Sequence, residues 1–155
     1  MVKVLFVCTG NTCRSPMAET LLREKVSNQH LDEKIIVKSA GLAVSVGSVA
    51  TSGARKAMLS KGLSLDHHVA TQLTLPILEE ADLILTMTKQ HKLGILQAVP
   101  SIEGKIYSLA EYADSQIDIA DPFGADEMIY QECAQQISQL IERLWDKICT
   151  FAEEK

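Results

Sequence analysis

Four short apolar runs alternate with segments of helical periodicity, and this alternation restricts the possible folds more than any other feature of the chain. Each run is bounded by loop residues, as is typical of parallel strands buried inside a sheet. The predicted strands cover residues 2–7, 35–40, 83–88 and 105–109. Parallel strands joined through helices require right-handed crossovers. We therefore expect one α/β domain over residues 1–155, with a four-stranded parallel sheet flanked by helices.

Helical patterns fill the intervals between the predicted strands. The first pattern has Ser15 as its predicted N-cap and Pro16 at its first helical position. The second is expected to end at Gly62, because glycine readily adopts the left-handed conformation that follows a helix. The remaining helices are predicted over residues 73–81, 89–99 and about 126–151.

Composition and charge exclude several classes of function. The formal net charge of −5 argues against nucleic acid as a partner, since binding to a phosphate backbone needs clustered Lys and Arg. No apolar stretch approaches the roughly 20 residues that span a bilayer, and no signal peptide precedes the first strand. We expect a cytoplasmic protein whose four cysteines are free thiols. Two of these, Cys133 and Cys149, fall in the last helical pattern and are predicted to be small buried hydrophobes.

The segment VCTGNTCRSP, residues 7–16, follows the first strand and is called here the cysteine loop. In parallel sheets ligands bind beyond the carboxyl ends of strands, where this loop begins. Its backbone N–H groups and the following helix N-terminus favour an anion, and Gly10 is expected to supply a positive φ. Arg14 offers a planar fork for two phosphoryl oxygens. The same electropositive setting favours the thiolate of Cys8, which predicts phosphoryl transfer to sulfur and hydrolysis of the resulting cysteinyl-phosphate.

A phosphoryl transfer of this kind needs an acid for the leaving group. Asp121, in the stiff segment DPFG, is the best candidate in the sequence. An aspartate before proline is equally common as a plain turn residue, so the pattern alone leaves both roles open.

Three other interpretations of the cysteine loop differ in strength. A zinc site on Cys8 and Cys13 lacks a second ligand pair, because the four histidines are scattered or adjacent, and we expect neither metal nor cofactor. A nucleotide P-loop would need the lysine and second glycine that are missing here. A dithiol redox site on Cys8 and Cys13 stays open, because an electropositive setting activates redox thiols too.

The cysteine loop, the tripeptide SAG at 39–41 and DPFG at 121–124 together resemble the low-molecular-weight protein tyrosine phosphatases, over essentially the whole chain. The resemblance implies Cys8 as nucleophile, Arg14 as phosphate clamp and Asp121 as general acid and then base. It implies that Ser15 donates a hydrogen bond to the Cys8 sulfur, and that Cys13 traps Cys8 in a reversible disulfide. The implied substrate-binding residues are Thr9, Gly10, Asn11, Thr12, Cys13, Ser15 and Phe123. Asn11 is expected to brace the loop, with Ser39 and His68 as its hydrogen-bonding partners.

Within this family, Thr12 and Phe123 make the chain look like the bacterial protein-arginine phosphatases. A threonine removes apolar bulk from the loop rim and offers a hydroxyl to a guanidino group. We therefore expect phosphorylated proteins as substrates and inorganic phosphate as product, with phosphoarginine favoured and phosphotyrosine as the alternative. The related arsenate reductases carry a redox cysteine pair near residues 80–90, which this chain lacks. A phospho-ligand binding module without turnover is the rival from another class.

Overall fold

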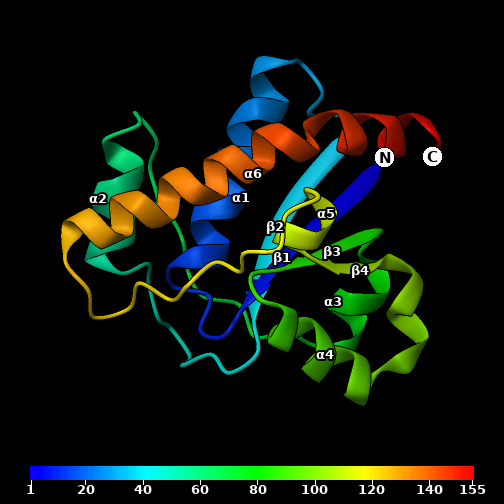
Figure 1. Ribbon diagram of the computed structural model, residues 1–155, viewed down its shortest axis with the longest axis horizontal. Helices are drawn as coiled ribbons and strands as arrows, with labels where there is room; N and C mark the ends of the chain where they lie inside the picture. Colours follow the sequence, from blue (N-terminus) through cyan, green and yellow to red (C-terminus); the bar gives the residue numbers. More distant parts are fainter.

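A computed structural model describes the whole chain, residues 1–155, and its strands form one parallel sheet (Figure 1). The strands are β1 (Val2–Cys8), β2 (Ile35–Gly41), β3 (Leu83–Thr86) and β4 (Ile106–Ser108). Their order across the sheet is β2-β1-β3-β4, and every neighbouring pair is parallel. The predicted α/β fold and all four predicted strands are confirmed.

Helices cover both faces of the sheet (Figure 1), and β1 contributes side chains to the core on each face. The helices are α1 (Arg14–Asn28), α2 (Ser52–Leu59), α3 (Leu75–Glu80), α4 (Lys89–Ala98), the 3₁₀ helix η1 (Pro100–Lys105), α5 (Leu109–Tyr112) and α6 (Glu127–Glu153). Phe6 and Cys8 belong to the larger core, which includes residues of α1, α2 and α6. Leu5 and Val7 point the other way, into a smaller core with residues of α3 and α4. This alternation is the period of two expected for a strand, and it places Cys8 on the α1 side.

Side-chain caps explain where most of the helices begin. In α2, α3, α4 and α6 the N-cap oxygen accepts a hydrogen bond from the N–H three residues ahead. These N-caps are Thr51, Thr74, Thr88 and Asp126. Such caps satisfy a backbone donor that has no partner inside the helix.

Two predicted helix ends were wrong. Helix α1 begins at Arg14 with Cys13 as its N-cap, and no side chain caps it, so Ser15 lies inside the first turn. Helix α2 ends at Leu59, although Gly62 does adopt the left-handed conformation with φ of 76°. The Ser15 hydroxyl lies next to the Cys8 sulfur and does not cap the helix.

Two short helices, η1 and α5, were not predicted. Helix α5 begins with a capping box, in which the Ser108 side chain and the Glu111 side chain each accept from the other's backbone N–H. The S-x-x-E pattern at 108–111 was the available signal. Both elements lie in the connections on either side of β4 and do not alter the sheet.

The long helix α6 crosses α1 and α2 on the larger-core side (Figure 1). Tyr130 near its start packs directly on Gly53 of α2, where an added Cβ would lie 2.3 Å from the tyrosine ring. The glycine is therefore required by packing and not by its φ angle. No helix of the chain, α6 included, is long and apolar enough to cross a membrane.

Candidate active site

The cysteine loop connects β1 to α1 at the carboxyl edge of the sheet (Figure 1). Cys8 is the last residue of β1 and is only 3% exposed. A cavity of about 400 Å³ opens above it. The lining residues are Cys8, Thr9, Gly10, Thr12, Cys13, Arg14, Ala43, Ser45, Ser48, Asp121 and Phe123. The structure thus brings together the predicted nucleophile, arginine and acid.

Two polar hydrogens are available to the Cys8 sulfur. The Ser15 hydroxyl oxygen lies 2.8 Å from Cys8 Sγ, and the Asn11 backbone N–H donates to the same sulfur at 3.3 Å. When Cys8 is a thiolate it has no proton to donate, so Ser15 must then be the donor. Both groups can thus point a hydrogen at the sulfur when it acts as the nucleophile.

The positive φ of the cysteine loop occurs at Asn11 and not at Gly10, which corrects the sequence prediction. Asn11 has a φ of 56°, whereas Gly10 is not among the residues with positive φ. Asparagine tolerates this conformation better than most residues, because its short polar side chain forms local hydrogen bonds. The side-chain contacts of Asn11 show this compensation.

Asn11 is fully buried, and its side chain and its backbone oxygen both have hydrogen-bond partners. Its Nδ2 donates to Ser15 Oγ at 2.8 Å and to Ser39 Oγ at 2.9 Å. Its Oδ1 accepts from the Thr71 N–H at 2.9 Å, and its backbone oxygen lies 2.7 Å from His68 Nε2. The structure thus places Ser39 and His68 beside Asn11, as the resemblance implied, and it adds Thr71.

The SAG tripeptide ends at Gly41, which lies directly against the cysteine loop. An added Cβ at Gly41 would lie 2.8 Å from the Thr9 carbonyl oxygen and 2.9 Å from the Asn11 nitrogen. Cβ atoms do not approach backbone atoms so closely, so only glycine fits here. The end of β2 therefore supports the loop from behind by close backbone contact.

Arg14 is buried, 5% exposed, and connects the cysteine loop to the segment before Asp121. Its Nη1 donates to the Ile119 carbonyl oxygen at 2.9 Å, and its Nη2 lies 3.7 Å from Asp121 Oδ2. The Ile119 carbonyl holds one side of the guanidinium in place, and Arg14 also lines the cavity. A planar group held in this way can present two N–H donors to a phosphoryl group.

Asp121 and Phe123 also line the cavity. The Asp121 side chain is 52% exposed, and its Oδ1 accepts from the Phe123 N–H at 3.1 Å. Phe123 itself is 70% exposed. One oxygen of the carboxyl group is thus used locally, and the other faces Arg14 and the cavity.

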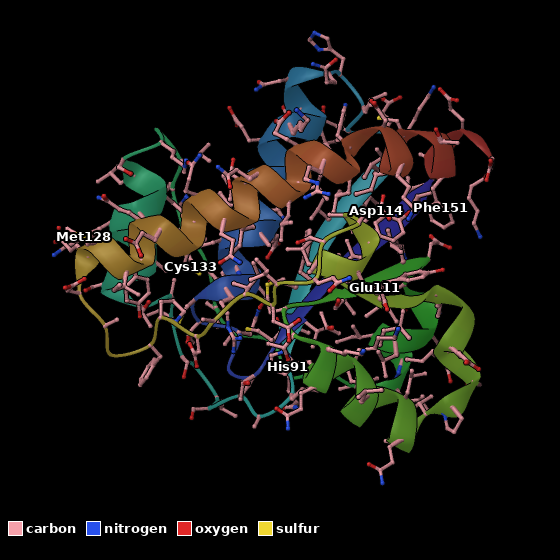
Figure 2. All side chains as sticks on the ribbon, in the orientation of Figure 1. His91, Glu111, Asp114, Met128, Cys133 and Phe151 are labelled. Atoms are coloured by element: carbon pink, nitrogen blue, oxygen red, sulfur yellow. The ribbon has the colours of Figure 1, made fainter.

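The second loop cysteine differs from the first in its surroundings. Cys13 Sγ lies 3.8 Å from Tyr130 Oη and 3.8 Å from Thr12 Oγ1, and burial raises the pKa of its thiol. Burial likewise raises the pKa of Cys133, on α6 (Figure 2), to about 12. Both are therefore poor thiolates at neutral pH. Cys133 is buried as predicted, whereas Cys149 is only half-buried.

Several residues at the site were missed from the sequence, including Ala43, Ser45 and Ser48 of the cavity wall and one histidine beside it. His91 lies in the first turn of α4 (Figure 2). Its Nε2 is 2.9 Å from Thr9 Oγ1. The two residues are 82 positions apart, and no local motif links them. Only the pairing of β3 beside β1 brings the start of α4 next to the cysteine loop.

A larger cavity, of about 590 Å³, lies behind the cysteine loop between α1, β2 and residues 64–71. It contains no cysteine, and its wall includes Ser39 and His68, which contact Asn11. The chemistry therefore belongs to the smaller cavity, where Cys8 lies. No group of three or more His, Cys, Asp or Glu side chains is arranged to hold a metal ion.

Residues 3–153 match the sequence profile of the family described as low molecular weight phosphotyrosine protein phosphatase. The chain belongs to this family. It is 39% identical over 142 residues to the protein-arginine-phosphatase of Bacillus subtilis strain 168, covering 91% of this chain and 93% of that protein. It is 32% identical over 152 residues to the low molecular weight protein-tyrosine-phosphatase PtpB of Staphylococcus aureus, covering 96% and 100%. The solved low molecular weight protein tyrosine phosphatase from T. tengcongensis superposes with a TM-score of 0.90 at 36% identity, covering 95% of this chain and 99% of that one.

Membership of this family confirms the resemblance inferred from the three motifs. The relatives carry two kinds of name, protein-arginine-phosphatase and protein-tyrosine-phosphatase. Both kinds are hydrolases that act on phosphorylated proteins, so the family fixes the reaction class.

Proposed function

We propose that this member of the family is a cysteine-dependent protein phosphatase that favours phosphoarginine over phosphotyrosine. The observation that carries the proposal is the convergence of Cys8, Arg14 and Asp121 on one cavity of about 400 Å³. A nucleophile, an anion-binding fork and an acid are the three groups that phosphoryl transfer to sulfur requires. Cys8 and Arg14 belong to the cysteine loop, whereas Asp121 comes from a distant segment that the fold brings to the same cavity.

In the first step the Cys8 thiolate attacks phosphorus. The P–S bond forms as the bond from phosphorus to the leaving oxygen or nitrogen breaks. Arg14 and the loop N–H groups bind the phosphoryl oxygens, whose charge is spread over three atoms in the transition state. Asp121 in its acid form gives its proton to the leaving group, which departs as a neutral phenol or guanidine.

In the second step water attacks the cysteinyl-phosphate. The Asp121 carboxylate, left by the first step, accepts a proton from that water. The P–S bond breaks, Cys8 leaves as the thiolate, and inorganic phosphate is released. Ser15 donates to that sulfur at 2.8 Å and so stabilises the leaving thiolate, which restores the starting enzyme.

The preference for phosphoarginine rests on Thr12 and on the relatives. Thr12 lines the cavity. Its backbone oxygen accepts from the Thr51 N–H at 2.9 Å, and this hydrogen bond holds the Thr12 backbone in place at the cavity rim. A hydroxyl there suits a polar guanidino group better than the face of a phenol. The 39% identity to a relative named protein-arginine-phosphatase supports the same preference, although the tyrosine phosphatase from T. tengcongensis, at 36%, is nearly as similar.

The deciding experiment measures kcat/KM on peptides that differ only in phosphoarginine or phosphotyrosine, with the wild type and Thr12→Ile in parallel. We expect the wild type to prefer phosphoarginine, and Thr12→Ile to shift the ratio toward phosphotyrosine by about tenfold or more. A small aryl phosphate serves as the control. Its kcat/KM tests whether the cysteine loop is intact, because such a substrate makes little contact with residue 12 at the cavity rim.

A wild type that prefers phosphotyrosine, with a ratio that Thr12→Ile leaves unchanged, would make this chain an ordinary tyrosine phosphatase. An initial product burst followed by sustained turnover would exclude a binding module, because such a module releases no phosphate.

We also place the protein in the cytoplasm, a proposal supported by its four free cysteines.

A further inference from the structure

His91 makes a contact with the cysteine loop that the reaction described above does not use. Its Nε2 lies 2.9 Å from Thr9 Oγ1, and Thr9 is the residue after the nucleophile and lines the same cavity. The imidazole is half-buried, and its Nδ1 is a buried side-chain nitrogen without any hydrogen-bond partner. No other buried side-chain nitrogen or oxygen in the protein lacks one.

The bare Nδ1 decides which nitrogen of His91 carries the proton. If Nδ1 carried it, a buried N–H donor would have no acceptor, which is rarer and costlier than a buried lone pair without a donor. The proton therefore belongs on Nε2, and Nε2–H donates to Thr9 Oγ1. Because that oxygen accepts from His91, the Thr9 hydroxyl hydrogen points elsewhere.

The charges around His91 favour its neutral form. Burial lowers the pKa of the imidazole, and the nearby Arg14 guanidinium lowers it further, while Asp118 and Asp121 act in the opposite direction. His91 also lies in the first turn of α4, where the helix dipole disfavours a cation. A second ring proton, on Nδ1, would again lack an acceptor. The neutral ring with its proton on Nε2 is the state that fits these surroundings.

We propose that His91 is a positioning residue that holds Thr9 Oγ1 as an acceptor, so that the Thr9 hydroxyl hydrogen is directed to the phosphoryl oxygens bound in the cavity. The inference rests on the proposed phosphatase function. It adds one side-chain donor to the backbone N–H groups and Arg14. His91 acts through Thr9 and does not itself touch the phosphoryl group.

The test compares His91→Leu, which removes the donor, with His91→Gln, whose side-chain amide N–H reaches about as far as Nε2–H. On an aryl phosphate we expect kcat/KM to fall about fivefold in His91→Leu and to stay within about twofold in His91→Gln. Thr9→Val should lose about as much as His91→Leu, and the double variant should lose no more than either single one. His30→Asn is the matched control, since His30 is exposed after α1 with a φ of 57° that asparagine accepts.

A second measurement does not depend on turnover. In ¹⁵N-labelled protein at neutral pH, the His91 ring should show a protonated Nε2 and a bare Nδ1. The opposite tautomer would overturn the inference, as would equal losses in His91→Leu and His91→Gln or additive losses in the double variant. A wild type that hydrolyses no phosphorylated substrate would instead contradict the proposed function, and the NMR result would still decide the tautomer.

Discussion

The cysteine loop and the acid segment, residues 116–126, line the same cavity but are held in different ways. The cysteine loop is mostly buried and is bonded from behind by Ser39, His68 and Thr71 through Asn11. The acid segment has no regular secondary structure and is mostly exposed. It is held by Ile119, whose N–H donates to the Met87 carbonyl and whose carbonyl accepts from Arg14, and by Asp118, whose Oδ1 accepts from the Lys89 N–H.

This difference matches the two tasks. A charge-stabilising site works best when its donors are fixed before the substrate arrives, because no energy is then needed to orient them. A proton donor must reach leaving groups of different shape, and a mostly exposed segment without regular secondary structure suits that task. The comparison teaches that changes to Cys8 or Arg14 in the cysteine loop should affect every substrate, while changes to the acid segment should depend on the leaving group.

The largest effect should come from the centre of the fixed loop. Cys8→Ser is expected to lower kcat by about ten-thousandfold or more, because the hydroxyl is a far weaker nucleophile at neutral pH. Inorganic phosphate should still bind, as measured by calorimetry, since Arg14 and the loop N–H groups are unchanged. Substantial remaining turnover would remove Cys8 from the mechanism.

Arg14→Lys breaks the bond between the two regions and should lower kcat/KM by about a hundred- to a thousandfold. The ammonium keeps the charge but can neither donate with two prongs nor hold the Ile119 carbonyl in the same geometry. Steady-state kinetics on an aryl phosphate and on both peptides would measure the loss. Near-normal rates would mean that charge alone suffices at this position.

Asp121→Asn tests the acid segment alone, and we expect kcat to fall about a hundredfold on peptide substrates. KM should change little, because the amide has nearly the same shape. An aryl phosphate with a strongly acidic phenol provides the control, since such a leaving group needs no proton and the loss should shrink. An equal loss on all substrates would argue that Asp121 only shapes the loop.

Gly41→Ala and Gly10→Ala form a matched pair at the cysteine loop. The first places a Cβ 2.8 Å from the Thr9 oxygen, whereas at Gly10 the nearest atom, Thr12 Oγ1, is 3.7 Å away. We expect Gly41→Ala to lower the free energy of unfolding by about 1–3 kcal/mol and to lower activity about tenfold. Gly10→Ala should leave the melting temperature almost unchanged. Thermal melts of both proteins would decide, and an equal response would contradict the close approach.

The smallest expected effect is a pH dependence from His91. Its pKa is lowered by burial first and by Arg14 second, so below the ordinary value of 6.5 the unfolded chain binds a proton that the folded residue does not. Stability should therefore fall with falling pH until the folded pKa is reached. Urea unfolding at about pH 7.5 and about pH 5.5 should show a smaller fall in His91→Gln than in the wild type. An identical fall would show that His91 is solvated like a free imidazole.

The sequence predicts local features of this molecule well and contacts between distant segments poorly. The four strands could be predicted because a short apolar run is the pattern that burial inside a parallel sheet produces. Asp121 was selected partly by its motif and partly by resemblance, since nothing in DPFG alone points to the cavity. The positive φ was assigned to Gly10 because glycine tolerates it most easily, but the buried hydrogen bonds of Asn11 stabilise it there instead.

His91 and the Ile119 carbonyl could not be predicted by any pattern near the cysteine loop. The first reaches Thr9 only because β3 pairs with β1, and the second reaches Arg14 only after the chain has passed β4. Such contacts are set by sheet order, which strand patterns do not specify.

The central place of β1 in the sheet has a consequence for the time course of folding. Strand β1 pairs Val2 with Ile35 of β2 on one side and Val4 with Leu83 of β3 on the other. Both of its edges are therefore paired only when β3 has joined the sheet. Closing these long loops costs entropy before any pairing is gained, which makes topologies of this kind slow to form. On the ribosome, a chain shorter than about residue 120 holds Cys8 but not the acid segment. We therefore expect the nucleophile to be synthesised early and its site to be assembled among the last parts of the molecule.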